Sequence, residues 1–195
     1  MTARRRALQA LPDTDTDPQD WRTPTAIDQF RPEHQFIGSL LWLGGDAAQP
    51  LLDLVPSEAI WDPQTRWAYE LIRRVVDAGN TPTPPAVLAA GRRHAATEAL
   101  DSATAPNSDR LAHLALYLFD AYAQAIAPAA AARIYARDVL EEAYRRAFAA
   151  AGTRMQELAA SDGIERDDLT RQFAAIADRL ADLGRRIDAA AGPHR

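Results

Sequence analysis

The chain of 195 residues carries a net charge of −5, and 47% of its residues are hydrophobic, a share dominated by 42 alanines. Alanine and leucine favour helices over strands, so we expect an all-α protein. Cysteine is absent, which excludes disulfides, thiolate nucleophiles and thiolate metal sites. All 22 basic residues are arginines, so no lysine can serve a phosphate-binding loop or form a Schiff base. The negative charge also argues against a protein that coats nucleic acid.

Residues 1–31 show no hydrophobic periodicity, and we expect a disordered or loosely docked tail there. The alternating aspartates from Asp13 to Asp17 resemble the start of a calcium-binding loop, but Pro18 and Pro24 stand where that loop needs Gly and Glu. We therefore favour an acidic, solvated segment. No signal peptide and no run of 18 apolar residues is present, so we expect a cytoplasmic protein without membrane contact.

A globular helical head is predicted over residues 32–127. Proline in a first turn, an aspartate cap and glycines after apolar stretches mark where its helices begin and end. In chain order, the signals are a helix from Pro32 to the glycine pair at 44–45, a short apolar segment at 51–55, a helix from Asp62 and Pro63 to Gly79, a short helix after Thr83, and a helix from Leu111 closed by Pro128.

Heptad-like patterns predict a long helical hairpin over 128–188, followed by a tail at 189–195. The connection at 161–165, where Asp162 and Glu165 have capping-box spacing, is short enough to force its two helices to run antiparallel. Apolar residues recur at spacings of three and four in both helices. They are Tyr144, Phe148, Ala151, Met155 and Leu158 in the first helix, and Leu169, Phe173, Ile176, Leu180, Leu183 and Ile187 in the second.

These apolar stripes can pack the two helices against each other, or they can present a second face to another protein. An isolated hairpin is narrow, and further apolar residues lie off the stripes, so we expect the hairpin to pack against a partner. The residues expected in self-association or partner binding are Tyr135, Val139, Tyr144, Phe148, Met155, Phe173 and Leu180.

Residues with catalytic chemistry show no recognised arrangement. The histidines at 34, 94, 113 and 194 lack metal-ligand spacing, and Ser39 lacks the glycines of a nucleophile elbow. Arginine pairs flank acidic residues, which favours solvated faces over a nucleic-acid stripe. We expect no enzyme activity, no catalytic residue, no metal site and no cofactor.

Three blocks of the sequence resemble the N-terminal domain of the DnaB-type replicative DNA helicase. Residues 33–41 match the opening helix of that domain with its Glu, Gln and Gly, and residues 55–69 match its proline, aromatic pair and following helix. Residues 135–148 match the start of its long hairpin. The blocks follow the order of the family and together span about 33–188.

The resemblance implies a small helical head followed by a long antiparallel hairpin. In the family the hairpins pair between subunits, and the resulting collar docks primase and loading proteins. It therefore implies a homodimer or higher oligomer that contacts a helicase, primase or loader, either as a stand-alone protein or as part of a helicase. The family's ATPase domain needs a phosphate-binding lysine, which this chain lacks, so we expect no ATP hydrolysis by it.

The alternative class is a DNA-binding regulatory protein of a mobile element. Its recognition helix would be the one at 63–78, with Arg66, Arg73 and Arg74 exposed to a groove. The apolar residues of that helix predict burial instead.

Overall fold

The computed structural model describes residues 30–96, 108–161 and 163–192, and within these ranges it contains helices and no strand. The all-α prediction is therefore confirmed. The expectations for residues 1–29, and for Asp162 as a cap, lie outside the described residues. The elements are α2 (Pro32–Trp42), α3 (Gly45–Leu54), the 3-10 turn η1 (Ser57–Ala59), α4 (Pro63–Asp77), α5 (Pro84–Gly91), α6 (Ser108–Ala123), α7 (Pro128–Ala160) and α8 (Arg166–Ala191).

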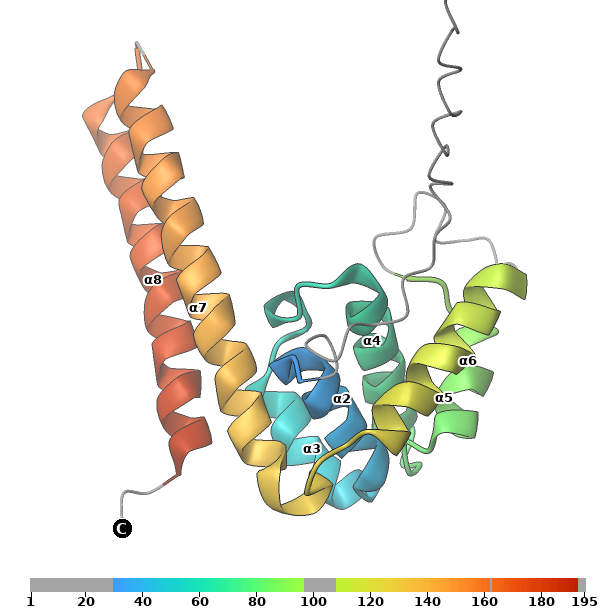
Figure 1. Cartoon of the computed structure of the whole chain (residues 1–195). Coiled ribbons are helices and arrows are strands. Elements are labelled where there is room, and N and C mark those ends of the chain that lie inside the picture. Colours follow the sequence, from blue (N-terminus) through green and yellow to red (C-terminus); the bar gives the residue numbers. More distant parts are fainter. Residues whose placement is uncertain (1–29, 97–107, 162, 193–195) are drawn as a thin grey trace, which may run out of the picture.

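Helix α2 lies at the centre of the head, between α4, α6 and the lower part of α7 (Figure 1). Phe36, Ile37 and Leu40 are completely buried, as expected for a helix that is covered on several sides. Gly38 allows the closest approach, because a Cβ there would lie 2.3 Å from the backbone oxygen of Ala121 in α6. The absence of a side chain at this position therefore sets how near α2 and α6 can pack.

Helix α4 begins and ends as its sequence predicts. The Asp62 side chain accepts a hydrogen bond from the Thr65 N–H at 2.8 Å, and Pro63 occupies the first turn. After the helix, Gly79 has a φ of 76°, the left-handed conformation that glycine adopts at little cost. Both ends of α4 are thus fixed by local interactions.

Two helices of the head, α3 and α6, differ in extent from the prediction, whereas α5 begins where it was expected. Helix α3 starts at Gly45 and includes Pro50, whereas the sequence predicted only a short apolar segment at 51–55. Burial of Ala48, Leu51 and Leu52 outweighs the weak helix propensity of glycine and proline. Helix α5 follows Thr83 as expected, without a side-chain cap. Helix α6 ends at Ala123, and Pro128 begins α7 instead of closing α6.

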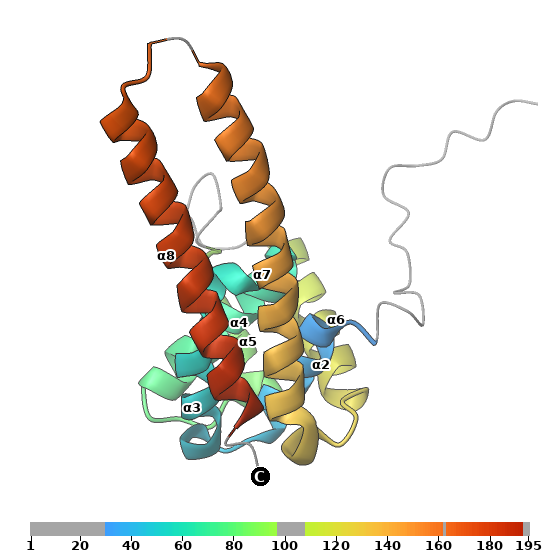
Figure 2. The ribbon, with the colours of Figure 1, turned by 90° about the vertical axis from the view of Figure 1, so that its left-hand side faces the viewer.

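Helices α7 and α8 form the antiparallel hairpin (Figures 1 and 2). The lower part of α7 packs against α2, whereas the outer part of the hairpin projects beyond the head in both views. Helix α8 runs to Ala191, three residues past the expected end at 188. The hairpin is therefore an arm that is attached at its base.

Only part of the apolar stripe predicted for the first hairpin helix is buried. Ala151 and Leu158 are buried, but Phe148 is 62% exposed and Met155 is 41% exposed. Two residues outside the predicted stripe are more buried, since Ala147 is half-buried and Leu140 is completely buried. Alanines let the two helices approach closely, and the bulky residues are rotated out of the contact.

Within the described residues no single helix is both long and apolar enough to cross a membrane. Helices α6 and α7 together have the length and apolar composition of a membrane span, but the chain bends by 115° between them.

Candidate interaction surface

A buried carboxylate joins the head to the hairpin. Glu33 is 9% exposed, and its oxygens accept hydrogen bonds from the backbone N–H groups of Trp61 at 2.7 Å and Asp62 at 3.2 Å. Arg146 of α7 lies 3.7 Å from the same carboxylate and donates to the Ala59 carbonyl at 2.6 Å. Its guanidinium also lies over the Trp61 ring, 5.5 Å from the centroid. These contacts fix α7 against the start of α2.

A second polar anchor joins α8 to α3. Arg186 donates to the backbone oxygens of Asp53 at 3.1 Å and Leu54 at 3.0 Å, which α3 leaves free at its C-terminal end. Asp182 accepts from Arg186 at 2.7 Å, and this hydrogen bond lowers the pKa of the Asp182 carboxyl. Together with the joint at Glu33, this contact holds both hairpin helices to the head at the base of the arm.

The connection from α6 to α7 is held by α2. The Gln35 side chain donates to the Gln124 carbonyl at 3.1 Å and accepts from the Ile126 N–H at 2.9 Å. The neighbouring His34 packs edge-on against the Tyr117 ring, and burial lowers its pKa. Ala127 has a φ of 47°, a left-handed conformation that is unfavourable for alanine and is held by these surrounding contacts.

Five apolar or aromatic side chains of the hairpin, three of them exposed, form what we call the hairpin flank. Phe148 and Phe173 are 62% and 60% exposed, and Tyr144 stacks on Phe148 with ring centroids 6.4 Å apart. Such large apolar side chains in contact with water favour a protein–protein interface. The flank comprises the exposed Phe148 and Met155 of α7 and Phe173 of α8, together with the half-buried Tyr144 of α7 and Leu180 of α8.

Helix geometry places these five residues on one side of the hairpin. In α7, residues 144, 148 and 155 lie on the opposite side of the seam from Ala136 and Val139, which pack into the head core. In α8, residues 173 and 180 lie on the opposite side of the seam from Leu183 and Ala190, which also join that core. Both sets therefore lie on the same side of the hairpin, and Tyr144 at the edge of this side also packs against the core.

Two of the predicted contact residues belong elsewhere. Val139 is completely buried in the core between the hairpin and the head, so it is excluded from any contact surface of the folded chain. Tyr135 is half-buried and donates through its hydroxyl to the Ile126 carbonyl at 3.1 Å, which holds the α6–α7 connection. Spacing alone did not distinguish these positions from the flank, because all of them are apolar or aromatic residues of one long helix.

The head carries an apolar groove that the sequence analysis missed. It lies between α5 and α6 and encloses about 230 Å³. Trp42 extends the apolar surface, because its indole stacks on Tyr122 with centroids 4.4 Å apart. The groove is lined by Pro84, Pro85, Leu88, Ala115, Leu118, Phe119 and Tyr122.

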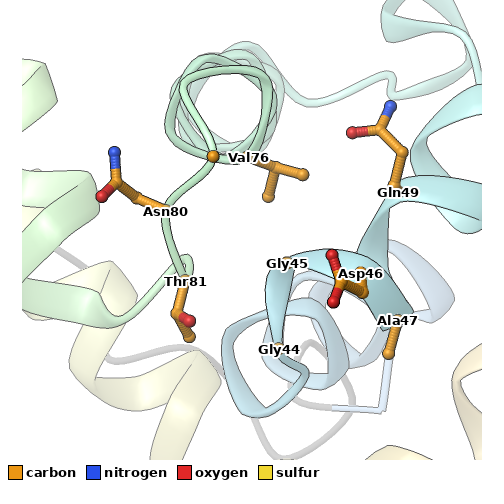
Figure 3. Close-up of a pocket in the computed structure, with 9 residues that line it drawn as sticks. Gly44, Gly45, Asp46, Ala47, Gln49, Val76, Asn80 and Thr81 are labelled. Carbon is orange, nitrogen blue, oxygen red and sulfur yellow. The ribbon is translucent and has the colours of Figure 1, made fainter.

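A second, more polar pocket of about 440 Å³ lies between the start of α3 and the turn after α4 (Figure 3). Asp46 is the only ionisable residue among its lining residues. A single carboxylate provides neither an acid–base pair nor a metal-ligand set. Elsewhere in the described ranges, no three histidine, aspartate or glutamate residues gather to hold a metal ion.

Helix α4 is poorly placed to act as a recognition helix. Seven of its apolar residues are buried in the head, so it offers little free surface to a DNA groove. Arg66 donates to the Ile60 carbonyl at 2.8 Å, and Arg73 donates to the Leu52 carbonyl. Tyr69 donates to the Val55 carbonyl at 2.5 Å, and burial raises its pKa to about 12. These polar groups hold the head together. The buried apolar residues of α4 are Trp67, Ala68, Tyr69, Leu71, Ile72, Val75 and Val76.

Comparison with known proteins identifies the fold. No family model matches the chain, and no curated protein matches it. Among solved structures, it is similar to the crystal structure of the N-terminal domain of DnaB helicase from Mycobacterium tuberculosis, with a TM-score of 0.61 and 23% sequence identity. The match covers 76% of this chain and 96% of that one. The chain therefore has the fold of a DnaB helicase N-terminal domain.

Proposed function

We propose that this chain is a non-enzymatic interaction module of DNA replication, which associates with a second copy through the hairpin flank. The observation that carries the proposal is the exposure of Phe148 on α7 and Phe173 on α8, at 62% and 60%, although the base of the same hairpin packs against the head. The likeness to the DnaB N-terminal domain supports the assignment to replication. The same module would dock a helicase, primase or loader.

A second copy suits the flank because of its charge. The flank residues are uncharged, and two charged pairs of α7 form within that helix, Arg154 with Glu157 at 3.5 Å and Arg137 with Glu141 at 2.8 Å. Residues 126–188 contain 10 arginines and 11 acidic residues, so the arm is nearly neutral. A neutral apolar surface favours neither a polyanion nor a strongly charged protein, whereas a two-fold contact covers one such surface with its copy.

Self-association is tested by sedimentation at micromolar concentration. The wild-type chain is expected to form dimers or higher oligomers, and the doubly substituted variant F148E/F173E is expected to be monomeric, because burying two carboxylates in the contact is costly. Leu116→Glu is the matched control, since Leu116 is 63% exposed on α6 of the head. A wild-type chain that stays monomeric, or a control that dissociates equally, contradicts the proposal.

The replication partners are tested separately, by mixing the purified chain with the replicative helicase, primase and loader of the same organism. Co-sedimentation with one of these proteins is expected. Tight binding to duplex DNA that weakens steeply with salt would instead favour a DNA-binding regulatory protein.

A further inference from the structure

The chain contains two sulfur atoms, and one of them lies on the hairpin flank. The sequence has no cysteine and two methionines, Met1 and Met155. Met155 is therefore the only thioether beyond the first residue, and it lies on the hairpin flank with 41% of its surface exposed. Exposed thioethers are the side chains that peroxides oxidise most readily when no thiol competes for the oxidant.

The surroundings of Met155 leave its side chain open to solvent. It lies two helical turns after Phe148, toward the outer end of the arm. Gly152, one turn before it, has no atom within 4 Å of the place where a Cβ would lie, so the side of α7 on which Gly152 lies is open. A small oxidant can therefore approach the sulfur when the flank is uncovered.

We infer that Met155 is an oxidation site through which a hydroperoxide weakens self-association; this inference rests on the proposed function. One oxygen atom passes from the hydroperoxide to the thioether sulfur. An S–O bond forms and the O–O bond breaks, and the hydroperoxide leaves as water or an alcohol. The sulfur loses two electrons and the hydroperoxide gains them, so the product is methionine sulfoxide.

The sulfoxide changes the contact more than it changes the folded monomer. Its oxygen is a strong hydrogen-bond acceptor that water satisfies on the exposed side chain. The five flank residues offer a single O–H donor, on Tyr144, so a sulfoxide covered by the flank of a second copy exchanges its water for a mostly apolar surface. We expect self-association to weaken about tenfold or more, whereas thermal unfolding of the monomer changes little.

The experiment treats the full chain with dilute hydrogen peroxide and follows two quantities over time. Mass spectrometry of peptides gives the sulfoxide fraction at Met1 and Met155, and sedimentation gives the dissociation constant. The oligomeric fraction is expected to fall in step with oxidation of Met155. The Met155→Leu variant keeps Met1 as an internal control, and the ratio of its dissociation constants with and without peroxide should be close to one.

A second variant and the opposite outcomes complete the test. Met155→Gln, which places an uncharged polar group at the same site, should associate more weakly than Met155→Leu without any peroxide. An unchanged dissociation constant after Met155 is oxidised, or resistance of Met155 to peroxide, overturns the inference and leaves the proposed function standing. Absence of association in the untreated wild-type chain overturns the proposed function itself.

Discussion

Glu33 links three parts of the molecule with one carboxylate. It accepts two backbone hydrogen bonds from the turn before α4 and faces Arg146 of α7. In Glu33→Gln an NH₂ group replaces one accepting oxygen and leaves a backbone donor without a partner. We expect a loss of about 1–3 kcal/mol in the free energy of unfolding, measured by urea denaturation.

The matched control is Glu142→Gln. The Glu142 carboxylate lies 3.8 Å from the same guanidinium but is 48% exposed, so the loss should stay below about 0.5 kcal/mol. Equal losses of unfolding free energy in the two variants would show that the backbone hydrogen bonds at Glu33 contribute no more to stability than the exposed ion pair of Glu142.

His34 predicts how stability depends on pH. Burial lowers its pKa below the ordinary value of 6.5, so the folded chain holds it neutral, while Asp120 and Gln124 oppose the shift only in part. Below about pH 6.5, His34 of the unfolded chain takes up a proton, whereas the buried His34 of the folded chain stays neutral until its lower pKa is reached. The free energy of unfolding therefore falls as pH decreases from 6.5 toward the lower folded pKa.

Urea denaturation between about pH 7.5 and pH 5 measures this slope. His34→Gln removes the titrating group, and its free energy of unfolding should depend less on pH, whatever its absolute value. If the wild type and the variant show the same pH dependence, His34 is not the group responsible.

Among the helices, two glycines with the same backbone conformation predict opposite effects of alanine. In α2, a Cβ at Gly38 would lie 2.3 Å from a backbone oxygen of α6, so Gly38→Ala must push the two helices apart and should cost about 1–3 kcal/mol. In α7, Gly152 has open space around it, and Gly152→Ala should stabilise the chain by about 0.5–1 kcal/mol. Thermal and urea unfolding of both variants check the signs. A stabilised Gly38→Ala would mean that α2 and α6 pack less closely than the structure shows.

The same helices show how far the sequence could lead. Caps and breakers at Asp62, Pro63 and Gly79 are local signals, so the bounds of α4 were predictable. Helix α3 was underestimated because its stability comes from burial of Ala48, which is a tertiary effect. In the hairpin, Ala147 and Phe148 are neighbours on the helix, and spacing treats both as apolar. Only the packing distance between α7 and α8 decides that the alanine enters the seam and the phenylalanine does not.

At the scale of the whole molecule, the head and the arm differ in how they are stabilised. The head surrounds α2 on several sides, whereas the outer hairpin has one narrow seam of alanine and leucine and an uncovered flank. A helix pair that projects into solvent in this way gains stability when its second apolar face is covered. Covering the flank with a second copy should therefore stabilise the folded state as well as form the oligomer.

This coupling predicts that the apparent Tm rises with protein concentration. When the concentration exceeds the dissociation constant tenfold, association adds about 1.4 kcal/mol to the folded state, which corresponds to a few degrees for a chain of this length. Calorimetry over a range of concentrations should show this rise for the wild type and for Leu116→Glu. The F148E/F173E variant should melt at a temperature independent of concentration. A wild-type Tm that does not change with concentration, in a chain that sedimentation shows to be oligomeric, would mean that unfolded chains associate as strongly as folded ones and that the flank is not the contact.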